Sequence, residues 1–199
     1  MTDTNCVGAL SSGRQSEDVG AGTVAHVPTA YFPAWKTLFV GGQRLLFGYG
    51  FLGILRRERC NMSGIARRML CSSDFQLSQI PSTVELVALS TSDLGFTNDV
   101  TLRDIIDHAQ VFGLMHCPHE TAPLLRMEYK YQLRGELLVV VTEAIELYGD
   151  DLRIFALTRD YIDRWLLGID GNPNNTWSTR VRFVFMRRPA PIPSFLWSV

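Results

Sequence analysis

Three side chains with reactive chemistry, Cys117, His119 and Glu120, lie close together in the sequence. A cysteine beside a base can act as a nucleophile, and imidazole and thiolate groups also bind zinc. A structural zinc site usually draws ligands from two separated segments, whereas the folded region holds no second group of cysteines or histidines. We therefore predict no metal site and keep these three residues as candidate catalytic residues. The structural alternative is a buried Cys117, with Glu120 capping a turn or paired with Arg126.

A second group of polar residues follows in the next segment. Arg126 and Glu128 alternate with apolar side chains and Tyr129, which is typical of a half-buried strand with polar residues on its wet face. With Glu120 and Glu136 they could converge on a carboxylate, a phosphate or a peptide edge. These residues are therefore candidates for a ligand or partner site.

Two tryptophans, Trp165 and Trp177, join those candidates because they lie beside acidic and asparagine-rich turns. They could stack on a sugar or a base, although a tryptophan in a strand is more often a core residue.

Residues 143–170 form an acidic region, with seven acidic side chains against three arginines. An acidic region beside a basic one suits a protein partner at least as well as a nucleic acid.

The basic region lies between residues 44 and 71, where six arginines stand against one glutamate. Basic helices contact phosphate groups readily. Arginine is abundant throughout this chain, however, and no helix-turn-helix pattern follows. The candidates for nucleic-acid contact are Arg56, Arg57, Arg59, Arg67 and Arg68.

Hydrophobic spacing predicts the elements that position these residues. The best-marked helix covers residues 102–112, with Thr101 and Asp104 as a capping box and Gly113 as its stop. Two further helices are predicted over residues 45–55, which glycines interrupt, and 62–70. Short segments bounded by turn residues predict strands at residues 35–40, 83–90, 124–132, 136–144, 153–158, 163–168 and 180–187.

Tight connections between these strands favour antiparallel pairing. We expect an α+β fold with a single domain over residues 31–187. It would have an antiparallel sheet of five or six strands and two or three helices packed on one face. A flexible leader (residues 1–28) and a proline-rich tail (residues 188–199) would flank it.

Composition limits the class of protein. The 199 residues suit one ordinary domain. The formal charge of −1 excludes a general electrostatic attraction of the whole chain to nucleic acids or to anionic membranes. Four cysteines without a CxxC pair favour reduced thiols in the cytoplasm, and the first residues lack the pattern of a signal peptide. Arg44 interrupts the apolar stretch over residues 38–55, so we expect no membrane span and no membrane partner. No cofactor is expected.

Several segments are shared with a known group: AWKTLFVGG (34–42), LSTSDLGF (89–96), CPHETAPLLRMEY (117–129) and RVRFVF (180–185). On these segments the chain resembles a family of small bacterial proteins with no assigned activity. The resemblance implies a shared fold over residues 35–187 and carriage on mobile DNA. The chain departs from the family at residues 45–55, where the family has a charged amphipathic helix. It also has Thr121 and Ala122 where the family has valine and glycine, so a different loop shape is expected there.

These observations favour a non-enzymatic binding or interaction protein whose partner is a protein or a small ligand. Residues 117–129 and an exposed strand edge would form its contact surface. The alternative is a small hydrolase or transferase that uses Cys117 or Glu120 with a histidine. A third hypothesis is nucleic-acid binding through residues 44–71.

Overall fold

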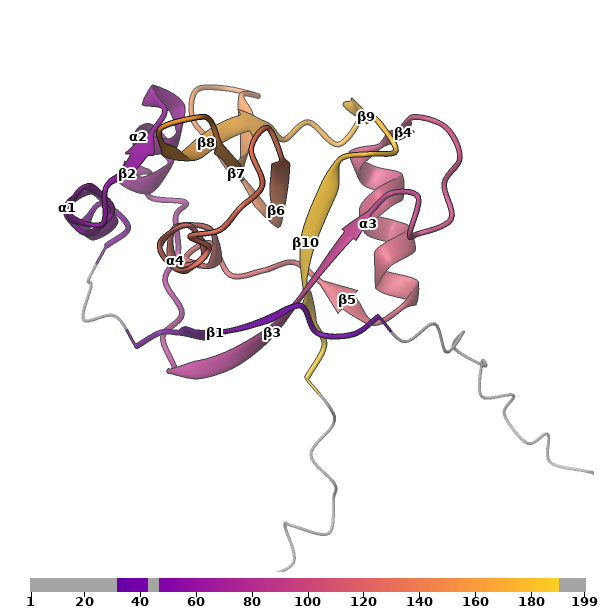
Figure 1. Ribbon diagram of the computed structural model, residues 1–199, viewed down its shortest axis with the longest axis horizontal. Coiled ribbons are helices and arrows are strands. Elements are labelled where there is room, and N and C mark those ends of the chain that lie inside the picture. Colours follow the sequence, from indigo (N-terminus) through magenta and orange to yellow (C-terminus); the bar gives the residue numbers. More distant parts are fainter. Residues whose placement is uncertain (1–31, 43–46, 190–199) are drawn as a thin grey trace, which may run out of the picture.

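The computed structural model describes residues 32–42 and 47–189. The predicted leader, the first residues of the predicted helix 45–55 and the tail from residue 190 lie outside the described residues. Within the described residues the chain forms four helices, an eight-stranded sheet and a separate two-stranded pair (Figure 1). This combination of helices and strands confirms the coarse α+β prediction. None of the helices in the described part is long and apolar enough to span a membrane.

The main sheet runs in the order β1-β3-β10-β6-β7-β8-β2, and β5 also pairs with β10. Its strands are β1 (Lys36–Val40), β2 (Cys60–Met62), β3 (Ser82–Ser90), β5 (Leu114–Met115), β6 (Leu137–Glu146), β7 (Leu152–Arg159), β8 (Arg164–Asp170) and β10 (Arg182–Arg187). The pairs β10–β6 and β2–β8 are parallel, and the other pairs are antiparallel. The second sheet joins β4 (Val100–Thr101) to β9 (Thr176–Trp177).

The four helices cover both faces of the main sheet. Helices α1 (Gly50–Arg57), α2 (Gly64–Cys71) and α4 (Thr121–Glu128) contribute to one buried core, and α3 (Leu102–Val111) contributes to the other. Strand β6 contributes side chains to both cores, since Leu138 and Val140 lie in the first core and Val139 and Val141 lie in the second. A continuous apolar run of this kind is typical of a strand buried on both sides.

The finer fold prediction was wrong in three respects. The described part has more strands and helices than predicted, the sheet is mixed, and the helices are not confined to one face. The reason is the last strand: β10 comes from the end of the chain and lies between β3 and β6, parallel to β6. Such a long-range insertion leaves no local sequence signal.

Local signals were more reliable. The Thr101 hydroxyl accepts a hydrogen bond from the Asp104 amide at 3.2 Å, and Gly113 adopts φ 74°, so the capped helix is confirmed. The strand predicted over residues 83–90 is confirmed as β3, and it is buried on both sides, with Leu86 in the first core and Val87 in the second.

The strand predicted over residues 124–132 was wrong. Residues Thr121–Glu128 form helix α4 instead. Pro123 lies in the first turn, where a missing amide hydrogen costs no intrahelical bond, and the following Leu-Leu-Arg-Met-Glu residues are good helix formers. The alternation that resembled a strand was therefore coincidental.

Candidate functional site

Cys117 is a core residue and is not placed as a nucleophile. Its side chain is buried, and its thiol donates to the backbone carbonyl of Val184 with Sγ and O 3.6 Å apart. Burial raises the pKa of the thiol far above its usual range, which keeps it protonated. A thiol in this state is inert, so the catalytic assignment of Cys117 loses its physical basis.

His119 has both ring nitrogens engaged with backbone groups. Its Nδ1 accepts from the Gln76 amide at 3.1 Å, and its Nε2 lies 3.0 Å from the carbonyl oxygen of Glu143. This pattern requires the neutral ring with the proton on Nε2. Burial also lowers the pKa of His119, which favours the same neutral form. The ring stacks on Phe75, so it joins two loops to the core.

Glu120 fastens two loops to the start of α4. Its carboxylate is buried, and Oε1 accepts from the amides of Gly41 and Ser78, both at 3.0 Å. It therefore does not form the ion pair with Arg126 that was one alternative. Cys117, His119 and Glu120 each bind a different backbone partner, so the predicted catalytic trio is not assembled. Within the described residues, no group of three or more His, Cys, Asp or Glu side chains could hold a metal ion.

Arg126 is fully buried, which corrects the prediction that it lies on a wet strand face. Its guanidinium donates to the Oε1 of Gln132, to the carbonyl of Tyr129 and, at 3.1 Å, to the carbonyl of Thr158. Burial lowers the pKa of Arg126 to about 10, so the group remains protonated at neutral pH. Arg126 therefore joins the end of α4 to the following loop and to β7.

The other polar candidates of that segment diverge. Glu128 pairs with Lys36 at 3.6 Å, and the Tyr129 hydroxyl donates to Glu136 at 3.2 Å. Glu136 forms an ion pair with Arg182 at 2.8 Å. The predicted convergent site is therefore dispersed over several separate contacts. Because residues 120–126 are all buried, most of the segment 117–129 cannot serve as the contact surface that was predicted.

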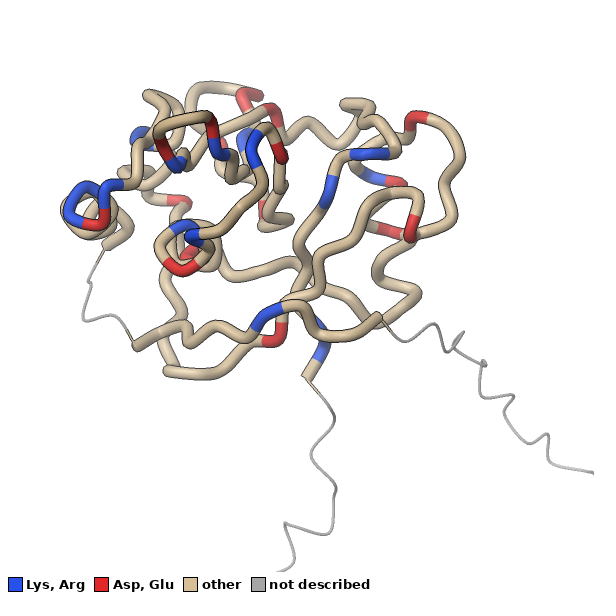
Figure 2. Tube along the Cα trace, viewed as in Figure 1, with Lys and Arg blue, Asp and Glu red and all other residues tan. Residues whose placement is uncertain are grey.

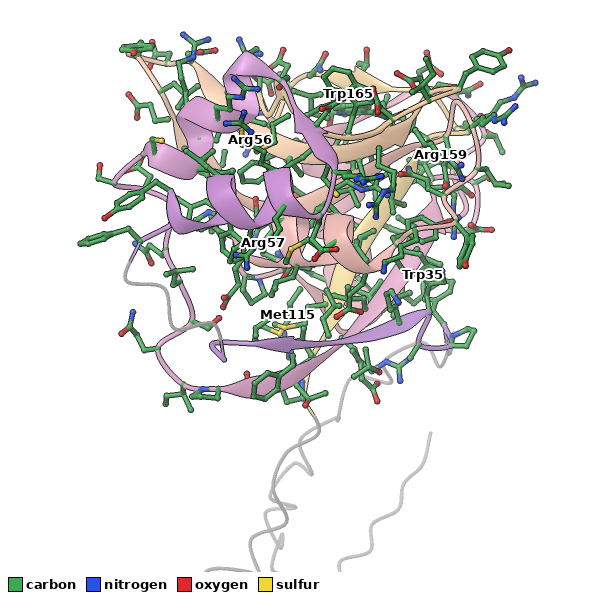
Figure 3. All side chains as sticks on the ribbon, turned by 60° about the vertical axis from the view of Figure 1, so that its left-hand side comes forward. Trp35, Arg56, Arg57, Met115, Arg159 and Trp165 are labelled. Atoms are coloured by element: carbon green, nitrogen blue, oxygen red, sulfur yellow. The ribbon has the colours of Figure 1, made fainter. Side chains whose placement is uncertain are left out.

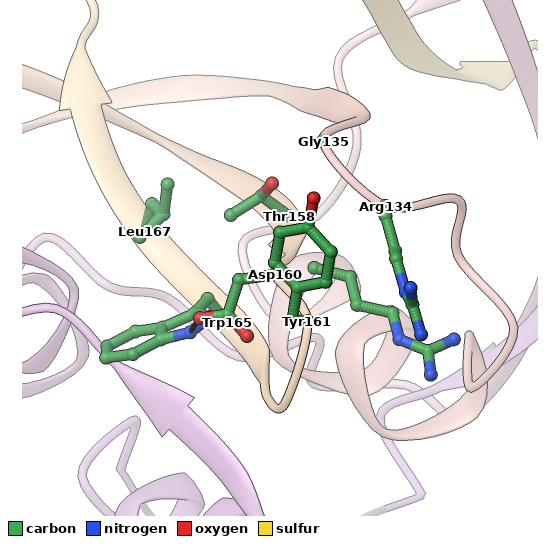
Figure 4. Close-up of a pocket in the computed structure, with 8 residues that line it drawn as sticks. Arg134, Gly135, Thr158, Asp160, Tyr161, Trp165 and Leu167 are labelled. Atoms are coloured by element: carbon green, nitrogen blue, oxygen red, sulfur yellow. Dashed lines mark hydrogen bonds between the residues drawn. The ribbon is translucent and has the colours of Figure 1, made fainter.

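The two tryptophans have different environments. Trp177 packs edge-on against Phe183 in the second core, with ring centroids 5.5 Å apart, so it is not a site residue. Trp165 lies on β8 and lines a hollow of about 560 Å³ (Figure 4). The walls of this hollow include Leu167 on β8, Thr158 and Arg159 at the end of β7, and residues of two neighbouring turns: Arg134, Gly135, Asp160 and Tyr161.

The turn between β7 and β8 is held by Asp160. Its carboxylate accepts from the amides of Ile162 at 2.8 Å and Asp163 at 2.6 Å, and from the indole N–H of Trp165 at 2.8 Å. These hydrogen bonds lower the pKa of Asp160, because they favour its ionised form. The turn therefore presents Tyr161 and Ile162 to solvent in a fixed arrangement, with exposed fractions of 82% and 88%.

The loop between α4 and β6 is held from beneath by Gln132. This side chain is buried and donates to the carbonyls of Leu157 at 2.9 Å and Glu136 at 3.2 Å. On either side of it, Tyr131 and Leu133 are 88% and 71% exposed.

The two turns are joined to each other. The Gly135 amide donates to the Arg159 carbonyl at 2.9 Å, and the Arg134 guanidinium lies 5.2 Å from the ring centroid of Tyr161. Together the turns form what we call the display surface, which consists of Tyr131, Leu133, Arg134, Tyr161, Ile162 and Trp165. Sequence reasoning found Trp165 and missed the other five. The available signal was the presence of large apolar residues in short segments beside turn residues: Gly135 in one segment and Asp160 and Asp163 in the other.

The arginines of the basic region lie on and between α1 and α2. Arg56, Arg57, Arg59, Arg67 and Arg68 are all exposed, and Figure 2 shows the basic residues of both helices on one side of the molecule. Arg56 and Arg67 line a second hollow, of about 530 Å³. The structure thus brings two of the nucleic-acid candidates together.

Neither a family model, nor a curated protein, nor a solved structure matches this chain. The resemblance to a bacterial family therefore remains a prediction.

Proposed function

We propose that this chain is a protein-binding module that docks a partner segment on the display surface. The observation that carries the proposal is the concentration of exposed apolar and aromatic side chains around the Trp165 hollow. Such a concentration is unfavourable in water and is typical of interaction sites. Tyrosine, tryptophan and arginine are also the residues that contribute most to binding energy at protein interfaces.

The display surface is preorganised. Buried Arg126 and Gln132 fix one turn from beneath, and the carboxylate of Asp160 fixes the other. A surface that is already ordered loses less conformational entropy on binding than a flexible loop does. This arrangement gives the buried polar residues of segment 117–132 a role in binding, although they do not contact the partner.

The chemistry of the hollow indicates what the partner carries. Asp160, the acidic residue in its wall, has both carboxylate oxygens occupied by hydrogen bonds within the turn. Arg134 and Arg159 line the same hollow, and among the described residues neither forms an ion pair with a carboxylate. We infer a partner segment with an apolar side chain that enters the hollow and acidic residues beside it.

We do not propose catalysis at Cys117, His119 and Glu120, because each of these side chains is engaged with the backbone. A cytoplasmic location is part of the proposal, and the free thiols of Cys60, Cys71 and Cys117 favour it.

The proposal can be tested by panning the immobilised full chain against a display library of short random peptides. Enriched peptides should combine an aromatic or aliphatic residue with Asp or Glu. The variants Tyr161→Ser and Leu133→Ser should each weaken their binding by about tenfold or more in calorimetry. The matched control is Tyr148→Ser. Tyr148 is also an exposed tyrosine under an arginine, with Arg68 at 5.8 Å, but lies in another turn.

Three results would overturn the proposal. The library could yield no enriched peptide, or the peptides could bind both display-surface variants as tightly as the parent. Equal weakening by the Tyr148→Ser control would also count against it, because the effect would then be independent of the site.

A further inference from the structure

The hollow between α1 and α2 has cationic side chains from both helices. Arg56 on α1 and Arg67 on α2 line it, and Asn61 on the edge strand β2 lies between these helices in the chain. Figure 3 shows Arg56 between α1 and α2, and Arg57 on the other side of α1. We call this feature the basic hollow; its remaining lining residues are Leu52, Gly53, Cys60 and Met62.

Within the described residues, the arginines around the basic hollow form no ion pair with an acidic side chain. Within the described residues, the side chains of Arg56, Arg57, Arg59 and Arg67 form no hydrogen bond or ion pair, and Arg68 contacts only the ring of Tyr148. Three arginines outside this region do pair with a carboxylate: Arg153 with Asp151, Arg182 with Glu136 and Arg187 with Glu85. Unpaired cations that lie together raise the local positive potential, although the whole chain is close to neutral.

The backbone that carries these arginines is firmly attached to the sheet. Arg59 has a positive φ of 54°, which reverses the chain from the end of α1 into β2. The Arg164 guanidinium donates to the Glu58 carbonyl at 2.6 Å and so fixes this corner to β8. On the other side, the Ser63 hydroxyl accepts from the amides of Ala66 and Gly168, both at 3.1 Å, and joins α2 to β8.

We propose that the basic hollow binds the phosphodiester backbone of a nucleic acid. Its charges are spread over two helices and the link between them, which suits a row of phosphates better than a single anion. Arginine donates to two phosphate oxygens at once, and the Asn61 amide adds a further donor. The basic hollow adjoins the display surface, because Asn61 pairs with Trp165 across strands β2 and β8. The proposal does not depend on the display surface binding a protein.

The test uses fluorescence anisotropy of labelled oligonucleotides with the full chain over a series of salt concentrations. Comparing a single-stranded RNA with a duplex DNA shows which nucleic acid supplies the phosphodiester backbone that is bound. A polyglutamate peptide of equal charge represents an acidic protein. The double variant Arg56→Ala/Arg67→Ala should weaken oligonucleotide binding by roughly tenfold or more. It should also make the slope of log K against log salt shallower by about 0.7 to 0.9 for each phosphate that is no longer neutralised.

The matched control is Arg103→Ala/Arg180→Ala, which removes the same charge from two exposed arginines outside α1 and α2. It should leave the slope unchanged. Equal effects of the two double variants would overturn the proposal, since they would show a response to net charge alone. Polyglutamate binding as tight as that of the oligonucleotides would overturn it in favour of an acidic protein. Tyr161→Ser should bind oligonucleotides normally, so a failure here is distinguishable from a failure of the proposed protein site.

Discussion

Replacing Arg126 by methionine should destabilise the protein by about 3 kcal/mol. Methionine fills much of the space of the arginine stem but donates no hydrogen bond. The substitution therefore leaves three acceptors without their donor: the amide oxygen of Gln132 and the carbonyls of Tyr129 and Thr158. The buried site allows little rearrangement around them, because Arg126 has no exposed surface.

The magnitude follows from the three hydrogen bonds that the substitution removes. A buried acceptor left without a donor costs about 1–3 kcal/mol. Only the bond to Gln132 is fully buried, whereas the bonds to Tyr129 and Thr158 are partly accessible and can be replaced in part by water. Methionine also removes the cost of burying the guanidinium charge, which offsets some of the loss. We therefore expect a net effect near the lower end of the summed range.

Urea denaturation followed by far-UV circular dichroism measures this effect, with the m-value expected to stay unchanged. The control is Arg159→Met, which makes the same substitution nearby. Arg159 is half-buried, and its one hydrogen bond, to the Gln132 carbonyl, is long at 3.5 Å. The control should stay within about 0.5 kcal/mol of the parent. A loss for Arg126→Met no larger than that of the control would refute the role assigned to the buried guanidinium.

Three further predictions concern titratable groups. In a Cys6→Ser background the exposed Cys71 should react quickly with a thiol reagent, whereas buried Cys117 should react only on unfolding; fast native-state labelling of Cys117 would contradict its core assignment. The pKa of His119 is lower in the folded state than its unfolded value near 6.5, so the unfolded state binds more protons between these two pKa values. The free energy of unfolding should therefore fall as the pH drops from above the unfolded pKa to below the folded pKa. His119→Gln should flatten this slope in urea titrations at several pH values. Protonation of Asp160 should change Trp165 fluorescence with a midpoint below that of an ordinary aspartate, and a midpoint at the ordinary value would contradict the turn described.

The parts of the fold that local sequence specifies could be predicted. The capping residues Thr101 and Asp104 mark α3 because a side-chain cap acts within one turn. The nearly apolar faces of residues 83–90 mark β3 as an inner strand, because both of its faces must be covered. The position of β10 between β3 and β6 could not be predicted, since it depends on which distant strand offers a matching edge.

The candidate site was only partly predictable for a related reason. Trp165 stands out by residue type, but the exposure of Tyr131 and Tyr161 depends on the contact between two turns that are distant in sequence. The burial of Arg126 gives no sequence signal either, because two of its acceptors are backbone carbonyls, which every residue carries.

The segment chosen from sequence as the contact surface therefore acts one layer below the surface. Arg126 holds Gln132, and Gln132 holds the turn on which Tyr131 and Leu133 are exposed. Loss of the guanidinium should then increase hydrogen exchange at the amides of residues 130–135 and weaken peptide binding, although Arg126 has no exposed surface. If Arg126→Met lowered global stability but left hydrogen exchange in this turn and peptide affinity unchanged, the buried network would stabilise the core alone and would not preorganise the turn for binding.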